Sequence, residues 1–353
     1  MTFSIDGRPV GIDHPPYIVA EISANHNGSL DTVFSLIDEA SAKGASAVKI
    51  QTYKPDTITL KSDAEMFRIK EGLWAGRTLY ELYEDAHLPW KWHRDIFAYA
   101  KESNITLFSS PFDETAVDLL EELGAPAYKI ASFEIVDLAL IEYAAKTKKP
   151  IIISTGLATL DEMKLAIETV KSTGNDQILL LHCVSGYPVT ADEYNLETIS
   201  DMAKQLDVEV GLSDHTLSNV TAICSIMFGA SFIEKHFTLD KNAGGPDDCF
   251  SMEPNQLGDL VESCNEAWRA KGRVEYRLKD SEKLNQQFRR SLFFVSDLDE
   301  GVVIEPQHVR SVRPGFGLPP KFLDQVVGNR LAKSVTKNSP VTESCLIRSL
   351  NQA

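Results

Sequence analysis

The stretch IIISTGLATLDEMKLAIETVKSTGNDQILLLH, residues 151–182, carries the pattern of a strand, a helix and a second strand. The run Ile151–Thr155 is apolar until it reaches two hydroxyl groups, and the run Ile178–His182 is apolar until it reaches an imidazole. Between the runs, Thr159 and Glu162 have the spacing of a helix capping box, and a glycine follows the last helical turn. The stretch therefore predicts two strands joined by one helix, with polar groups where each strand ends.

This segment is one of a series. Eight apolar runs end on polar or charged residues, with seven helix-like stretches between them and an eighth after the last run. The runs span residues 17–21, 47–51, 106–110, 127–132, 151–155, 178–182, 210–215 and 232–236. This alternation predicts an α/β fold, the (β/α)8 TIM barrel. The carboxyl ends of the strands form the catalytic face of such a barrel, so we expect these terminal residues to converge there.

The chain has 353 residues, which exceeds the roughly 250 of a typical TIM barrel, and the surplus lies at the C-terminus. After the polar stretch 279–287, the sequence changes to short β-like pieces, beginning with Ser291–Val295, that are punctuated by glycine and proline. We therefore expect a TIM-barrel domain over residues 1–280, followed by a linker and a small, mainly β domain over residues 281–353. A short turn at residues 3–7 could plug the barrel floor.

Composition narrows the class of protein. Hydrophobic residues make up 43% of the chain, which is enough for a large core, and no apolar stretch approaches the roughly 18 residues needed to span a membrane. The first residues lack the order of a signal peptide, so we expect a cytoplasmic protein. A net charge of -16 argues against nucleic-acid and membrane partners. Five cysteines without a CxxC pair argue against disulfides and a structural zinc site.

One connection in the predicted barrel is unusually long. Residues 54–89 separate the second strand from its helix, where two to six residues are usual. On the catalytic face, such a loop is typically a lid or a substrate-recognition element. Its residues Trp74, Arg77, Tyr80 and Tyr83 are suited to contact with a sugar-sized ligand. An exposed insertion or a dimer contact is the alternative.

Two histidines suggest a metal site. His215 and His236 end the seventh and eighth runs, which are neighbours in a closed barrel, so both imidazoles could reach one divalent ion. The alternative is that one of them serves a hydrogen-bond network. Asp247, in a loop after the eighth run, could support the metal or bind a ligand hydroxyl, or it could simply form a turn.

Two lysines suggest an anionic substrate. Lys49 and Lys129 end the second and fourth runs, and hydroxyl groups end several others. These hydroxyls belong to Ser109, Ser110, Ser132, Ser154 and Ser213. Two ammonium groups among hydroxyls suit a phosphate and a carboxylate on one small molecule, whereas the absence of a P-loop or GxGxxG motif argues against a nucleotide. A lysine that forms a Schiff base, as in an aldolase, remains a second interpretation.

Polar groups also follow the first and sixth runs. Glu21, Asn25, His26 and Asn27 lie just before a glycine and could bind a polyhydroxylated ligand, although an Asn-Gly turn would also account for Asn27. Tyr187 follows the sixth run and could either stack on a substrate or pack in the core.

Nine motifs occur in order along the chain: EISANHNG, VKIQTY, FSSPFD, YKIAS, STG, LLHCVSGYP, GLSDHT, IEKHFTLD and GGPDDCFSMEP. Together they resemble the motifs of the nonulosonic (sialic-type) acid synthases. The later stretch RPGFGLPP resembles the antifreeze-like (SAF) domain of the same enzymes, so the resemblance covers almost the whole chain. It implies a transferase that condenses phosphoenolpyruvate with an N-acetylated amino sugar.

The resemblance also implies roles for the residues named above. Phosphoenolpyruvate would be bound by Lys49, Lys129, Ser132, Ser154 and Ser213, with a hydroxyl from Ser109 or Ser110 contributing. His215 and His236 would bind Mn²⁺ or Mg²⁺. The catalytic set would be Lys129, Asp247, Asn27, His215 and His236. The sugar-binding set would be Gln51, Arg77, Tyr187, Asp247 and Arg313. In the family, an arginine from the partner subunit's SAF domain lies over the sugar, which implies a domain-swapped homodimer. Asn27 stands where glutamate is common in sialic acid synthases, so its part in proton transfer stays open.

Within the family, residues 72–83 and the apolar Phe250 and Met252 resemble the branch that makes pseudaminic acid. Apolar surroundings suit a sugar that carries a methyl group in place of a hydroxymethyl group. The implied sugar is 2,4-diacetamido-2,4,6-trideoxy-L-altropyranose, and the implied products are pseudaminic acid and phosphate. Legionaminic acid and N-acetylneuraminic acid synthesis are alternatives, because their sugars are closely related. A barrel that binds a sugar without turnover is a further alternative.

Overall fold

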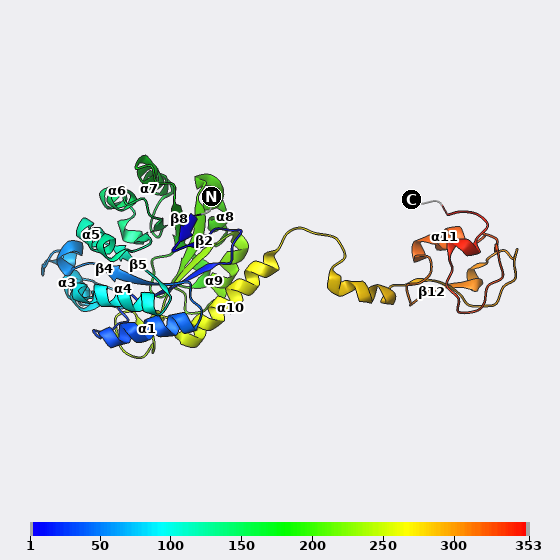
Figure 1. Ribbon diagram of the computed structural model, residues 1–353, viewed down its shortest axis with the longest axis horizontal. Coiled ribbons are helices and arrows are strands. Elements are labelled where there is room, and N and C mark those ends of the chain that lie inside the picture. The colour runs from blue at the N-terminus through cyan, green and yellow to red at the C-terminus, as the bar shows by residue number, and fades with distance from the viewer. Residues whose placement is uncertain (1–2, 351–353) are drawn as a thin grey trace. The chain divides into compact units, whose positions relative to one another are not determined.

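The computed structural model describes residues 3–350, and its first unit, Met1–Gly272, is built around a closed barrel of eight parallel strands (Figure 1). Each strand pairs with the next one along the chain, and the last pairs with the first. The strands are β3 (Tyr17–Glu21), β4 (Ala47–Thr52), β5 (Thr106–Pro111), β6 (Tyr128–Ile130), β7 (Ile151–Ser154), β8 (Ile178–Cys183), β9 (Glu209–Asp214) and β10 (Phe232–His236). The predicted TIM barrel is confirmed.

A helix follows each strand. These helices are α1 (Leu30–Ala42), α4 (His93–Glu102), α5 (Glu114–Leu123), α6 (Leu138–Ala145), α7 (Leu160–Ser172), α8 (Glu197–Leu206), α9 (Val220–Ser225) and α10 (Pro254–Lys271). The predicted capping box begins α7, because the Thr159 hydroxyl accepts from the Glu162 N–H and the Glu162 carboxylate accepts from the Thr159 N–H at 2.7 Å. Gly174 follows this helix with φ of 79°, a conformation that glycine adopts without strain.

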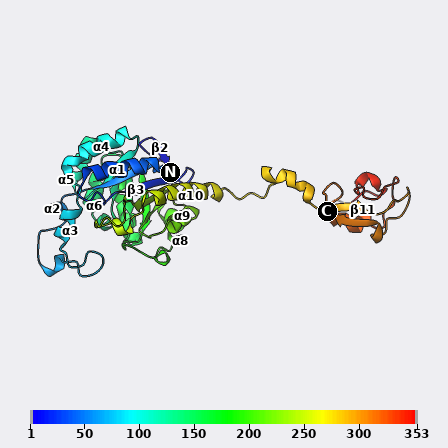
Figure 2. The same cartoon turned by 90° about the horizontal axis from the view of Figure 1, so that it is seen from below.

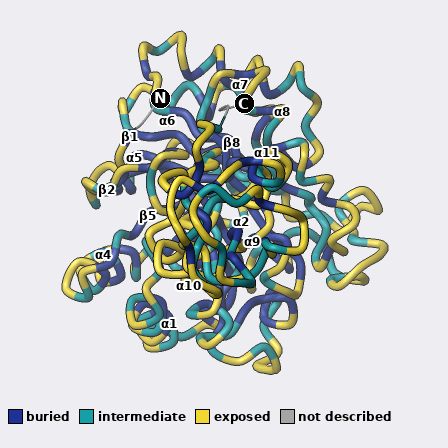
Figure 3. Tube along the Cα trace, turned by 90° about the vertical axis from the view of Figure 1, so that its right-hand side faces the viewer, coloured by how far each residue is buried: buried dark blue, intermediate teal, exposed yellow. Residues whose placement is uncertain are grey.

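Side chains alternate along each strand, so that one set packs against the surrounding helices and the other points into the barrel interior. In β10, Phe232 packs in the barrel floor, Ile233 packs against the helices, and Glu234 returns to the interior. The floor also contains Phe3 and Ile5 from the hairpin of β1 (Phe3–Ile5) and β2 (Arg8–Val10), so the predicted plug is confirmed. Figure 3 shows the buried strands in dark blue and exposed segments in yellow. Apolar side chains fill the barrel interior at the floor, and polar side chains occupy the mouth, where the strands have their carboxyl ends.

The long connection after β4 contains two short helices, α2 (Pro55–Ile58) and α3 (Leu79–Ala86). Figure 2 shows this segment, in blue, extending from the barrel beside the labels α2 and α3. Most of its residues between 59 and 77 are exposed or half-buried. Tyr83 anchors it, because its ring lies 5.8 Å from that of Tyr53 at the end of β4.

The second unit, Arg273–Ala353, has its own small core. Strands β11 (Ser291–Phe294) and β12 (Val309–Val312) pair antiparallel, and α11 (Leu323–Val326) lies later in the chain. The division falls at the glycine that ends α10, earlier than the predicted boundary after residue 280, and residues 276–290 are exposed. Among residues 3–350, no helix combines the length and the apolarity needed to cross a membrane.

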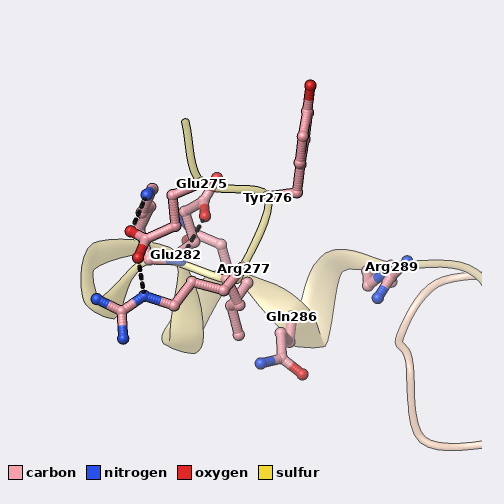
Figure 4. Close-up of a pocket in the computed structure, with 9 residues that line it drawn as sticks. Glu275, Tyr276, Arg277, Glu282, Gln286 and Arg289 are labelled. Atoms are coloured by element: carbon pink, nitrogen blue, oxygen red, sulfur yellow. Dashed lines mark hydrogen bonds and ion pairs between the residues drawn. The ribbon is translucent and has the colours of Figure 1, made fainter. Parts of the chain in front are cut away.

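A surface hollow lies in the segment that precedes β11 (Figure 4). Its lining includes Glu275, Tyr276 and Arg289. Glu275 pairs with Arg277 at 2.8 Å and with Lys279 at 2.6 Å, so its charge is already compensated. No strand-end residue of the barrel lines this hollow. It is a feature of the linker and does not contain the chemistry predicted for the barrel.

Candidate active site

Four buried charges from four strands of the barrel meet in its mouth. Glu21 ends β3 and lies in register with Lys49 of β4, and their side chains form an ion pair of 2.7 Å. Across the interior, Lys129 of β6 lies 3.1 Å from Glu234 of β10, which is also 3.5 Å from Lys49. All four residues are at most 5% exposed. Two ammonium groups and two carboxylates therefore form one network, which we call the lysine–glutamate cluster.

Burial and pairing act against each other in this cluster. Burial disfavours the charge of Lys49, but the Glu21 and Glu234 carboxylates outweigh it and raise the lysine's pKa. Burial likewise opposes the Glu234 charge, but Lys129 and Lys49 lower its pKa below the usual value. The pKa of Lys129 is lowered because burial prevails there. A bound anion could therefore change how the protons are distributed among these lysines and glutamates.

Hydroxyl groups surround the cluster, and alternation decides which serines belong to it. Ser110 accepts a hydrogen bond from Lys49 at 3.1 Å, whereas Ser109 donates to the Ile50 carbonyl at 3.0 Å on the other side of the strand. Ser213 lies 3.5 Å from Glu234. The buried Ser154 hydroxyl and one Glu234 oxygen have no hydrogen-bond partner within the described structure. Buried polar atoms are rarely left unpaired, so these two are available to a ligand.

The predicted histidine pair forms beside this cluster. The rings of His215 and His236 lie 5.5 Å apart between centroids. His215 Nδ1 lies 2.9 Å from the Val184 carbonyl, so it donates there and leaves Nε2 free to bind a ligand. His236 Nδ1 is buried without a hydrogen-bond partner, 3.8 Å from an oxygen of Asp247. Burial and the nearby His215 hold the pKa of His236 well below its usual value.

This donor set fits a divalent metal, because imidazole nitrogens with a nearby carboxylate are suitable ligands and His236 Nδ1 is otherwise orphaned. Within residues 3–350, no group of three or more His, Cys, Asp or Glu side chains already has metal-binding geometry. A bound ion would therefore keep positions open for substrate or water.

A polar chain links Asp247 to the cluster. Ser23 donates to Asp247 at 2.5 Å, and Gln51 donates to Ser23 at 3.0 Å and to Glu21 at 3.2 Å. Burial raises the pKa of Asp247 above its ordinary value. The chain connects the ends of β3 and β4 with the loop after β10. The predicted residues Gln51 and Asp247 therefore lie in the same mouth as the lysines and histidines.

Aromatic rings line the histidines. The Tyr187 ring lies 4.3 Å from that of His215, and the Phe250 ring lies 5.0 Å from that of His236. Tyr187 and Phe250 are 5.3 Å apart. The mouth therefore has polar groups around the lysines and an apolar surface around the histidines.

Two predicted site residues have other contacts in this structure, and a third lies in the second unit. Arg77 pairs with Asp85 and donates to the Glu81 carbonyl at 2.6 Å. Asn27 donates to Asp248 at 3.0 Å and so holds the loop that carries Asp247. Arg313 is an exposed residue of the second unit. The roles predicted for their side chains stay predictions.

Three mouth residues escaped the sequence prediction. Glu234 and Cys183 each lie two residues after an interior apolar residue of the same strand, so strict alternation would have found both. The Cys183 sulfur lies 4.0 Å from His215 Nδ1. Glu134 follows β6 in a short 3-10 turn, where no periodic pattern points to it. One of its oxygens is buried without a hydrogen-bond partner within the described residues.

Glu134 should make stability depend on pH. Burial raises its pKa from 4.5 to about 7, so the folded state binds an extra proton between these values. Its favourable contribution is present below pH 4.5 and is lost as the pH rises through 7, a change of about 3 kcal/mol at most. We expect Glu134→Gln to flatten the pH dependence of the unfolding free energy between pH 5 and 8, measured in urea. An unchanged slope would contradict this assignment.

Comparison with known proteins agrees with the geometry. Residues 36–276 match the NeuB family, and residues 289–347 match the SAF domain. Pseudaminic acid synthase of Helicobacter pylori is 42% identical, over 95% of this chain and 99% of that protein. N,N'-diacetyllegionaminic acid synthase of Legionella pneumophila is 35% identical, over 93% of this chain and 94% of that protein.

A solved structure shares the architecture. The spore coat polysaccharide biosynthesis protein spsE from Bacillus subtilis is 30% identical and gives a TM-score of 0.68, with 99% of this chain and 100% of that chain covered. The barrel fold, the match to the SAF domain and the nine sequence motifs thus indicate the same family. The chain belongs to the NeuB family.

Proposed function

We propose that this protein is a pseudaminic acid synthase. It condenses phosphoenolpyruvate with 2,4-diacetamido-2,4,6-trideoxy-L-altropyranose and water, and it releases pseudaminic acid and phosphate. The observation that carries the reaction type is the lysine–glutamate cluster beside the histidine pair, since the cluster could bind an anion and the histidines could hold a metal. The greater identity to the H. pylori pseudaminic acid synthase than to the legionaminic acid synthase favours this sugar.

Phosphoenolpyruvate would bind at the lysine–glutamate cluster. Lys49 and Lys129 supply ammonium groups, and the hydroxyl of Ser154 has no other hydrogen-bond partner among the described residues. The remaining hydroxyls come from Ser110, Ser132 and Ser213. A phosphate or carboxylate placed here would gain charge-assisted hydrogen bonds in a site that is shielded from water.

The open-chain sugar would bind between the histidines and the aromatic surface. His215 and His236 would hold Mn²⁺ or Mg²⁺, which when bound supplies a Lewis acid for the sugar aldehyde. Gln51 and Asp247 offer hydrogen bonds to hydroxyl and amide groups, and Tyr187 offers a ring to pack against. The two substrates would thus lie side by side with restricted orientations.

The reaction balances as a condensation followed by hydrolysis. The electron pair of the phosphoenolpyruvate double bond forms the new C–C bond to the aldehyde carbon, and the aldehyde oxygen takes up a proton. Water adds to the positively charged carbon that still bears phosphate. The C–O bond to phosphate then breaks and leaves the keto group. Lys49 and Lys129 stabilise charge on the phosphate and carboxylate throughout.

Phosphate release tests the proposal directly. The purified protein is incubated with phosphoenolpyruvate, Mn²⁺ and one of three sugars: the diacetamido-trideoxy-altrose, its manno isomer used for legionaminic acid, or N-acetylmannosamine. We expect release with the first sugar and at least tenfold less with the others, because one misplaced polar group costs about that much or more. Preference for another sugar would overturn the substrate assignment and leave the family chemistry in place.

A Schiff-base aldolase is the second candidate, favoured by the burial that lowers the pKa of Lys129. Borohydride added with substrate would inactivate such an enzyme irreversibly. The proposed synthase should survive this treatment, because none of its steps links a lysine covalently to the substrate.

We also propose that the active enzyme is a domain-swapped homodimer in which Arg313 of one subunit completes the site of the other. Support comes from the family resemblance and from the exposure of Arg313. We expect Arg313→Ala and His236→Ala to be inactive alone and to regain up to about a quarter of wild-type activity when co-expressed, because one mixed site in the heterodimer is intact. The measurement is phosphate release. Failure to complement would contradict the shared site.

A further inference from the structure

Trp74, in the long connection after β4, contacts residues at the mouth of the barrel. Trp74 is half-buried, although its neighbour Leu73 is 50% exposed. The Trp74 indole N–H donates to the Pro246 carbonyl at 3.1 Å, so the connection is attached to the loop after β10. Arg77, three residues later, is held by Asp85 and Glu81 instead. Trp74, unlike Arg77, therefore contacts residues of the site.

Trp74 extends the aromatic surface beside the histidines. Its ring lies 5.8 Å from that of Tyr187, which in turn lies 5.3 Å from Phe250. Tyr187 packs 4.3 Å from His215, and Phe250 packs 5.0 Å from His236. Three aromatic rings from three separate loops thus form one apolar surface, which we call the aromatic wall. The polar groups Gln51, Asp247 and Ser23 form a separate hydrogen-bonded chain.

We propose that the aromatic wall binds the deoxygenated end of the sugar and that Trp74 is a specificity-determining residue. This inference rests on the proposed function, because it concerns the same substrate. A methyl group at C6 would pack on the rings, whereas a hydroxyl at C6 would lose its hydrogen bonds to water there. The acetamido and hydroxyl groups would instead face the polar chain. The connection after β4, which carries Trp74, then determines whether a sugar with a methyl group or one with a hydroxyl at C6 is preferred.

A purely structural role for Trp74 predicts a different result. Its hydrogen bond to Pro246 adjoins Asp247, so loss of the indole could simply displace that carboxylate. Displacement would impair every sugar equally, because Asp247 belongs to the polar chain. A role in binding C6 would change the preference between sugars. Trp74→Phe separates the two roles, since it keeps an aromatic ring and removes the N–H donor.

The experiment compares kcat/KM for the 6-deoxy diacetamido sugar with that for its analogue bearing a hydroxyl at C6. We expect Trp74→Ala to lower the wild-type preference for the 6-deoxy sugar roughly tenfold, mainly through KM, while KM for phosphoenolpyruvate stays unchanged. Trp74→Phe should retain most of the preference. The exposed Leu73→Ala is the matched control and should behave as wild type. Unfolding in urea verifies that each variant is folded.

Each possible result of this comparison leads to a different conclusion. A wild-type ratio in Trp74→Ala, or an equal loss towards both sugars, would overturn the assignment of C6 to Trp74 while the proposed function stands. Loss of the preference in Trp74→Phe as well would assign the effect to the N–H donor and overturn the wall. A wild-type enzyme that does not use the 6-deoxy sugar would overturn the proposed function and this inference together.

Discussion

Replacing His236 by alanine should reduce kcat at least about a thousandfold and remove bound Mn²⁺. His236 has a buried Nδ1 without a hydrogen-bond partner in the described structure, and its lowered pKa keeps the imidazole neutral, as a ligand must be. Loss of a Lewis acid at the aldehyde removes several kcal/mol of transition-state stabilisation, and about 4 kcal/mol corresponds to a thousandfold. Phosphate release and the metal content of the dialysed protein measure the two effects.

His182 provides the matched control. It lies on β8, and burial lowers its pKa too, but it contacts the Tyr194 carbonyl, and it falls between the interior residues Leu181 and Cys183. His182→Asn should therefore retain metal and most turnover. Chelation of the wild-type protein should abolish activity, and added Mn²⁺ should restore it. Activity that survives chelation, or near-normal kcat in the His236 variant, would remove the metal from the proposal.

The barrel was predictable because its signal is repeated. Each strand is a short apolar run, and each intervening helix has its own start and stop, as Thr159 and Gly174 illustrate for α7. The ends of the runs indicated the site residues, since parallel strands in a closed barrel bring their carboxyl ends together. Alternation, applied strictly, would also have selected Ser110 over Ser109 and added Glu234.

Other features depend on relations that a single sequence does not contain. The pair of Glu21 and Lys49 depends on the register between β3 and β4. The contact of Trp74 depends on the path of an irregular connection, in which Trp74 and Arg77 are equally plausible until their partners are known. Glu134 lies in a turn, where neither a period of two nor one of 3.6 residues applies.

Removal of the Lys129 charge should destabilise the barrel as well as abolish turnover. In Lys129→Met, Glu234 loses its ion pair of 3.1 Å and retains the longer one, with Lys49 at 3.5 Å, while it stays buried. Breaking a buried ion pair from one side costs roughly 3 kcal/mol or more, because the remaining charge loses its closest partner. We expect this loss in the urea unfolding of the barrel, together with a loss of phosphate release.

The double variant Lys129→Met with Glu234→Gln separates stability from catalysis. It removes one positive and one negative charge from the lysine–glutamate cluster, so most of the lost stability should return. Turnover should not return, because an ammonium group for phosphoenolpyruvate is still missing. A double variant as unstable as Lys129→Met would show that Glu234 is not the group left uncompensated. If the double variant turned over normally, Lys129 would serve the fold alone, and the anion site would have to rest on Lys49.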